Sequence, residues 1–149
     1  MKNKTSSKKK KSILNVFSGN PFMASVFGAL SGIISIAILT PVFSAIAQNL
    51  SDPDSFVLPF GMIISFVSYF LAGLLAAKLK SAALPCGILS GVILQSLMFI
   101  LSILIKGNYS AISSPILETI LRIAFVFISV LGAVIAVNSK KSPKKKKRK

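Results

Sequence analysis

Four long apolar runs dominate this sequence and leave few folds open to it. Three runs carry no charged residue and the fourth carries two; they are Phe22–Ala47, Phe56–Ala77, Ala82–Ile105 and Ile116–Val137. Each run reaches the ~20 mostly apolar residues that a helix needs to cross a bilayer. A helix also satisfies the backbone hydrogen bonds of such a run within the segment itself. The sequence therefore predicts an all-α membrane protein with four transmembrane helices.

The basic residues are concentrated at the two ends of the chain. The net charge is +15, with six lysines within residues 1–11 and seven lysines plus Arg148 within residues 138–149. Runs of like charge repel one another and favour disorder. We therefore predict one transmembrane domain over residues 22–137, flanked by disordered basic tails at 1–21 and 138–149.

The loops between the runs predict the orientation of the chain. The second loop contains Lys78 and Lys80, whereas the first contains only Asp52 and Asp54 and the third contains Lys106. Together with the tails, sixteen basic residues fall on one side and one on the other. Because basic residues in short loops stay on the cytoplasmic side, both termini are expected in the cytoplasm of a multi-pass cell-membrane protein.

The first span has a second interpretation. A basic N-terminus, an apolar run and the sequence Ala45-Ile46-Ala47 also fit a secretory signal with its cleavage site. The apolar part of such a signal is usually ~7–15 residues, and this run is much longer. Cleavage would leave three spans, so the four-span interpretation is the one we adopt.

The two halves of the chain resemble each other. GALSG at Gly28–Gly32 returns as GILSG at Gly87–Gly91, an offset of 59 residues. Fifteen of the fifty positions in 28–77 are identical to their counterparts in 87–136. An apolar alphabet produces some matches by itself, but internal repeats are common in membrane folds. The interpretation is a tandem duplication of a two-helix hairpin.

Small residues occur at matching positions of the repeat. The first and third spans each contain two glycines four residues apart, and the second and fourth each contain a glycine followed by alanines. Such spacing lets helix backbones approach closely in a bilayer. The spacing leaves open whether they pack within one chain or between copies. The candidate helix-packing residues are Gly28, Gly32, Gly73, Gly87, Gly91 and Gly132.

Three polar side chains fall within the predicted spans. Glu118 and Arg122 are four residues apart on the fourth span, so they share a helical face and can pair. Ionisable residues inside a span suggest an ion relay or an anchor for an anionic substrate; near a span end they also serve as a plain structural pair. Gln95 in the third span is explained by a hydrogen bond to another helix.

Little in the composition supports catalysis. The chain has no histidine, one cysteine (Cys86) and three carboxylates, two of which lie in the first loop. A histidine-based triad or metal site is excluded, and one cysteine makes no intrachain disulfide. We expect no enzyme activity, no metal and no cofactor.

The basic tails have two readings. Alone they look like tracts that bind nucleic acid. Next to membrane spans, each basic residue is attracted to anionic lipid by roughly 1 kcal/mol. Anionic lipid head groups are therefore the expected partners, and a membrane-tethered nucleic-acid binder is a minor alternative.

One stretch resembles a known family. Ala72-Gly73-Leu74-Leu75-Ala76-Ala77-Lys78 followed by Gly87-Ile88-Leu89-Ser90-Gly91 is similar to a pattern in small four-span membrane proteins found mainly in Gram-positive bacteria, a family without an established function. The similarity covers roughly residues 27–137. It departs where two glycines often lead the first motif, and where Pro85-Cys86 replaces an aromatic residue or histidine. The resemblance implies a bacterial inner membrane and supplies no active site.

These features favour one function and leave another open. The leading hypothesis is a non-enzymatic integral membrane protein that acts through helix packing, as a homo-oligomer or as a subunit of a membrane complex. The alternative is a small transporter or channel in which Glu118 and Arg122 line the path, with Gln95 nearby.

Overall fold

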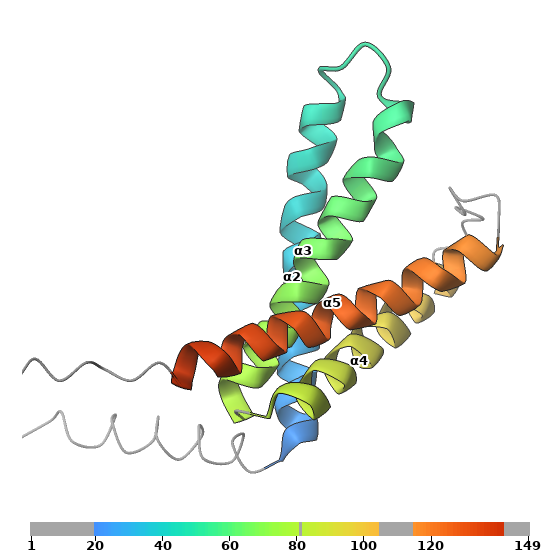
Figure 1. Ribbon diagram of the computed structural model, residues 1–149. Helices are drawn as coiled ribbons and strands as arrows, with labels where there is room; N and C mark the ends of the chain where they lie inside the picture. Colours follow the sequence, from blue (N-terminus) through green and yellow to red (C-terminus); the bar gives the residue numbers. More distant parts are fainter. Residues whose placement is uncertain (1–19, 81, 105–114, 142–149) are drawn as a thin grey trace, which may run out of the picture.

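The computed structural model describes residues 20–80, 82–104 and 115–141. Most of the two expected basic tails lies outside these ranges. The described residues form four helices and contain no strand: α2 (Pro21–Ala47), α3 (Asp54–Lys80), α4 (Ala83–Leu104) and α5 (Pro115–Lys141) (Figure 1). The predicted all-α fold with four long apolar helices is confirmed.

Local sequence explains where these helices begin and how far they run. The side chain of Asn20 caps α2 by accepting a hydrogen bond from the backbone N–H of Phe22 at 3.0 Å, and a proline occupies the first turn. α3 and α5 end at Lys80 and Lys141, beyond the predicted residues 77 and 137. Lysines near a helix C-terminus are favoured by the helix dipole, so Lys78 belongs to the end of α3 rather than to a loop.

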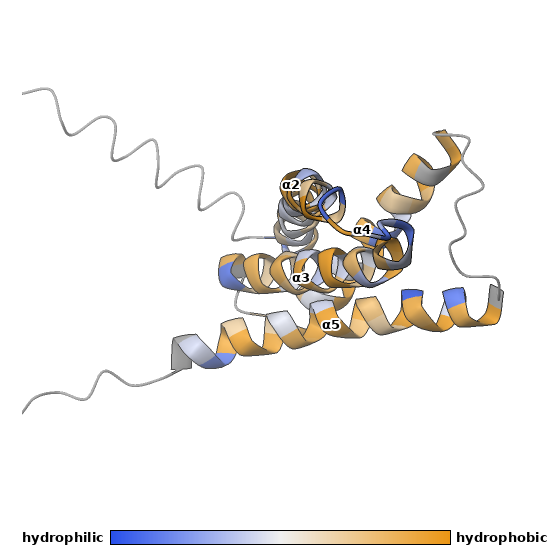
Figure 2. Cartoon of the chain, turned by 90° about the horizontal axis from the view of Figure 1, so that it is seen from above, coloured by the Kyte–Doolittle hydropathy of each residue, from blue (hydrophilic) through white to orange (hydrophobic). Residues whose placement is uncertain are grey.

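The helices expose most of their apolar surface. Each contains a stretch with a mean hydropathy of 2.0 to 2.7, of which only 22% to 39% is buried within the chain. The ribbon in Figure 2 is correspondingly coloured hydrophobic along much of each helix, with hydrophilic turns near the start of α5 and near the helix ends. So large an apolar surface requires apolar surroundings, and the chain is a multi-pass membrane protein.

The helices form two hairpins that cross each other. α2 with α3, and α4 with α5, run side by side, and the two pairs cross at a wide angle (Figure 1). The hairpins meet where Pro21, Lys80, Ala83 and Lys141 lie, which we call the tail end. They diverge toward the ends where α2 stops and α3 starts and where α4 stops and α5 starts, which we call the loop end (Figure 1).

The repeat is not matched by a symmetric set of helix contacts. Within the described residues, α3 and α4 each contact the other three helices, whereas α2 and α5 have no Cα pair within 8 Å. A strict two-fold arrangement would make the α2–α5 contact equal to the α3–α4 contact. The two hairpins therefore pack asymmetrically: α4 contacts both α2 and α5, and the described residues of these two helices do not contact each other.

The core is built from small side chains. All of the described residues that are buried lie between the tail end and the middle of their helix. Hydrophobic residues among them are Ala24, Ala29, Tyr69, Ala72, Ala76, Ala77, Cys86, Leu94, Ala133 and Ala136. Small side chains let helices approach closely, which explains why the hairpins touch here and separate beyond.

The hairpins touch at a reciprocal contact between α3 and α5. A Cβ atom on Gly73 would overlap the carbonyl oxygen of Ser129, and one on Gly132 would overlap the carbonyl oxygen of Phe70. These contacts exchange under the repeat offset, because 129 − 70 and 132 − 73 both equal 59. A contact of this kind is what a duplicated hairpin with a local two-fold axis produces.

The two GxxxG pairs pack within the chain, each on the other helix of its own hairpin. A Cβ on Gly28 would overlap Ala72 and Ala76 of α3, and one on Gly87 would lie 2.7 Å from the Cα of Val130 of α5. Gly32 and Gly91 make the matching contacts one turn further along, with Gly32 also reaching Leu94 of α4. The spacing left open whether these glycines pack within one chain or between copies; in this structure they pack within the chain.

Alanine substitution should separate packed from unpacked glycines. We expect Gly73→Ala and Gly132→Ala to lower the free energy of unfolding by about 2–3 kcal/mol, because backbone atoms occupy the new methyl position and cannot rotate away. Gly61→Ala is the control, since no atom lies within 4 Å of its Cβ position, and it should not destabilise. Unfolding in mixed micelles, followed by circular dichroism, measures all three; equal losses would contradict the assigned crossing.

Candidate functional site

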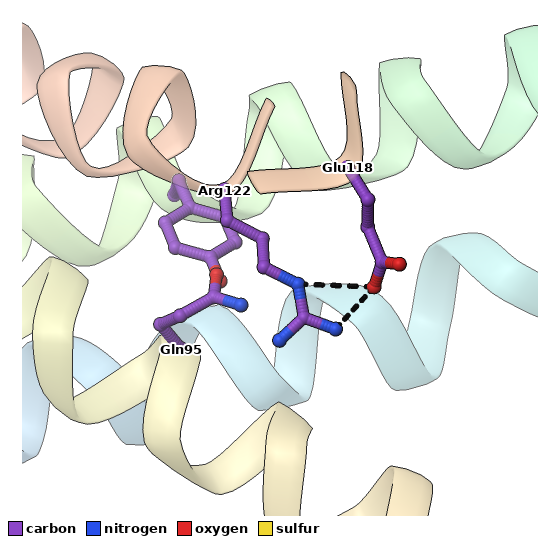
Figure 3. Close-up of polar contacts among 4 residues, drawn as sticks. Gln95, Glu118 and Arg122 are labelled. Atoms are coloured by element: carbon purple, nitrogen blue, oxygen red, sulfur yellow. Dashed lines mark hydrogen bonds and ion pairs between the residues drawn. The ribbon is translucent and has the colours of Figure 1, made fainter. Parts of the chain in front are cut away.

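Polar side chains gather where the two hairpins begin to diverge. On α5, Arg122 Nε donates to Glu118 Oε1 at 3.1 Å, and Arg122 Nη2 donates to the same oxygen. Figure 3 shows the guanidinium lying between the Glu118 carboxylate and the side chain of Gln95 on α4. The i,i+4 spacing predicted this pairing, and the structure adds that it faces a neighbouring helix.

The charged pair is only partly covered. The side chains of Arg122 and Glu118 are 38% and 36% exposed. The guanidinium carbon lies 5.6 Å from the ring centroid of Phe99 on α4, within cation–π range. Within the described residues, Glu118 Oε2 accepts no hydrogen bond and Arg122 Nη1 donates none. The pair therefore has unused hydrogen-bonding capacity on a face that the described part of the chain leaves partly exposed.

Tyr69 connects three helices next to this pair. Its hydroxyl donates to Gln95 Oε1 on α4, and its ring stacks on Phe125 of α5 with centroids 5.4 Å apart. Gln95 thus has the cross-helix hydrogen bond expected of it. Sequence reasoning missed Tyr69. The sequence did contain a signal. Tyrosine is enriched at membrane interfaces, so a tyrosine near the middle of a span is unusual and needs an explanation.

Two adjoining cavities open between the hairpins. One of about 180 Å³ is lined by polar and aromatic side chains including Ser65, Tyr69, Gln95 and Arg122. The other, of about 390 Å³, extends toward the loop end between α2 and α3 and is mostly apolar, with Phe43 and Phe60 in its wall. Both are lined by Ile36, Ser65 and Met98. We refer to the two cavities together as the cleft.

A second polar cluster is buried at the α4–α5 contact. Ser129 Oγ lies 2.9 Å from the carbonyl oxygen of Gly87, to which it donates, and 3.0 Å from Ser90 Oγ. Ser90 Oγ also donates to Gly87 O, as Ser31 Oγ does to Gly28 O in the first hairpin. These hydroxyls are satisfied within the protein, so their role is to join helices rather than to bind a ligand.

The described residues offer no set of three potential metal ligands. Cys86 is fully buried, and its backbone carbonyl accepts a hydrogen bond from Ser25 Oγ at 3.4 Å. This burial indicates that Cys86 is a small packing residue.

The chain matches no family model, no curated protein and no solved structure. The resemblance to four-span proteins of Gram-positive bacteria stays a prediction.

The hydrogen bond between Tyr69 and Gln95 can be measured with a double-mutant cycle. We expect Tyr69→Phe and Gln95→Leu to couple by about 0.6 kcal/mol, the average for such bonds between membrane helices. Ser96→Ala is the matched control, because Ser96 donates only to Val92 O of its own helix and should show no coupling with Tyr69→Phe. Unfolding in mixed micelles gives the four free energies, and zero coupling would mean that the bond contributes nothing.

Proposed function

We propose that this chain is a non-enzymatic bacterial inner-membrane protein that works as a homo-oligomer. A second copy covers the cleft at the polar cluster formed by Tyr69, Gln95, Glu118 and Arg122. The observation that carries this proposal is the position of Glu118 and Arg122. They are more than one-third exposed on an otherwise apolar helix, at the edge of the cleft. Ionisable residues at membrane depth are costly when they face lipid, so a protein surface covering them lowers the free energy.

A second copy is the occupant with the right chemistry. Two atoms of the pair have no hydrogen-bond partner among the described residues: the acceptor Glu118 Oε2 and the donor Arg122 Nη1. In a two-fold interface the same patch is used on both copies. Each Arg122 can then donate to the Glu118 of the other copy, which forms two intermolecular ion pairs and leaves no charge unpaired.

The small-residue stripes are not available for this assembly. The six glycines already face other helices of the same chain, so the interface has to use the exposed faces of the loop end. Large apolar side chains there include Phe99, Ile103, Ile116 and Ile120. Helix association in lipid then depends on packing of these side chains together with the polar pair.

The remaining parts of the proposal rest on composition. Sixteen basic residues against one support cytoplasmic termini. The sequence has no histidine, and two of its three carboxylates lie at the turn of the first hairpin, Asp52 before α3 and Asp54 at its first residue. Both facts support a role without catalysis. Anionic lipid head groups are the proposed partners of the basic tails.

Assembly should depend on the charged pair as a unit. We expect the full chain in lipid vesicles to dimerise, and the double variant Glu118→Gln/Arg122→Gln to dimerise about tenfold more weakly, because two ion pairs become weaker amide contacts. The reversed variant Glu118→Arg/Arg122→Glu restores complementary charges and should retain the dimer. Single-molecule photobleaching of labelled chains counts the copies.

Three outcomes would overturn this assignment. One is a wild-type chain that is monomeric across the accessible concentration range. Another is a double variant that associates as tightly as the wild type. The third is a stoichiometric second protein that replaces the self-contact in membranes of the source cell, which would make the chain a subunit of a mixed complex.

A small transporter is the second candidate, and the polar cavity favours it. Arg122, Gln95 and Tyr69 line a space of about 180 Å³ that shares three lining residues with an apolar cavity. Guanidinium and amide donors around such a space suit a small anion. This reading makes Arg122 part of a path rather than part of an interface.

Flux measurements distinguish the two candidates. In proteoliposomes, chloride and acetate efflux should be saturable if the chain transports anions. Arg122→Gln should abolish it, because Arg122 is the only cation among the described residues that line the cavity. Glu118→Gln should change the rate less, since Glu118 does not line the cavity. Efflux no faster than from protein-free vesicles would exclude transport of these anions.

A further inference from the structure

A third cavity lies at the tail end of the first hairpin, away from the cleft. It has a volume of about 390 Å³ and lies between α2 and α3. Its walls are apolar except for Ser31 and Lys78, and its apolar lining residues are Phe27, Leu30, Ile34, Leu75 and Leu79. Among the described residues that line it, Lys78 is the only charged one, and its side chain is exposed. We call this cavity the Lys78 groove.

The shape of the groove follows from the positions of its residues along the helices. Phe27 and Ile34 are seven residues apart on α2, a rise of about 10 Å. That is about one-third of a ~30 Å hydrocarbon core. Lys78 lies in the last turn of α3, near the point where the helix leaves its apolar stretch. A cation at one end of a short apolar strip matches a molecule with an anionic head and a hydrocarbon chain.

We propose that the Lys78 groove binds one anionic phospholipid from the leaflet at the tail end. The ammonium of Lys78 contacts the head-group phosphate, and the first part of one acyl chain fills the strip between α2 and α3. Given the charge bias of the loops and tails, this leaflet is the cytoplasmic one, where anionic lipids are abundant. The site shares no residue with the polar cluster, so it does not depend on the proposed oligomer.

The first hairpin contains an internal comparison for this site. The apolar cavity at the loop end has the same volume, about 390 Å³, and is also formed by α2 and α3. No charged residue is among the described residues that line it. Acyl chains will fill any apolar groove in a bilayer, so volume alone gives no preference for a head group. Lys78 is the feature that gives one groove such a preference and not the other.

Native mass spectrometry of lipids retained by the full chain tests the proposal. The protein is reconstituted in phosphatidylcholine nanodiscs with a minor fraction of phosphatidylglycerol, then released. The wild type should retain one phosphatidylglycerol above its bulk proportion. Lys78→Gln should lower this preference about fivefold, the equivalent of the roughly 1 kcal/mol that anionic lipid gives one basic residue. Lys78→Arg should retain it.

Three further variants separate the groove from the rest of the chain. Lys144→Gln removes the same charge from the C-terminal tail and should lower the preference less than Lys78→Gln, because a tail lysine attracts the anionic surface without holding one lipid in the groove. Ser31→Phe and Ile34→Trp place bulk at residues that line the groove and should remove the retained lipid whatever its head group. Circular dichroism establishes that each variant keeps its helical content.

Three results would overturn the proposal. Equal losses in Lys78→Gln and Lys144→Gln would assign the preference to total charge. Retention of the two lipids in their bulk ratio would mean that the groove has no head-group preference. Displacement of the lipid by millimolar glycerol 3-phosphate would show that Lys78 binds a free phosphate ester and that the groove adds nothing.

Discussion

The close approach of α3 and α5 is the contact on which the rest of the structure depends. Lipid tails are as apolar as leucine, so hydrophobicity does not hold two hairpins together in a bilayer. Contact between backbones does, and Gly73 and Gly132 allow it because any side chain would overlap the opposite carbonyl oxygen. α2 packs on α3 and α4 packs on α5 through their own glycines. One crossing thus sets where the hairpins touch and where they separate.

Features that are local in sequence were predictable. Apolar length gave the four helices, and i,i+4 spacing gave the pairing of Glu118 with Arg122. The angle between the hairpins was not predictable, because apolar residues give no preferred direction when every face can meet lipid. Tyr69 reaches Gln95 across 26 positions of sequence, and only the relative placement of α3 and α4 brings them together. Some glycines pack within a hairpin and others form the crossing between α3 and α5. Which glycine does which also depended on how the helices are placed relative to one another.

The two halves of the chain share their packing residues and differ in their polar ones. Under the offset of 59, Gly28, Gly32 and Gly73 correspond to glycines. Gln95 and Arg122 correspond instead to isoleucines, Glu118 to Pro59 and Tyr69 to Ile128, so each polar member of the cluster exists in only one half. Lys78 likewise corresponds to Val137. Retained residues maintain the frame, and diverged ones supply the chemistry that distinguishes one hairpin from the other.

The length of the helices ties the shape of the protein to its bilayer. α2, α3 and α5 each have 27 residues, about 40 Å of helix, against a hydrocarbon core of ~30 Å. Helices longer than the core tilt to keep their apolar surface covered, and two hairpins joined at one end tilt away from each other. A thicker bilayer favours a smaller tilt and a narrower cleft, and a thinner one a wider cleft. Membrane thickness is therefore a physical variable that acts directly on the space around Arg122.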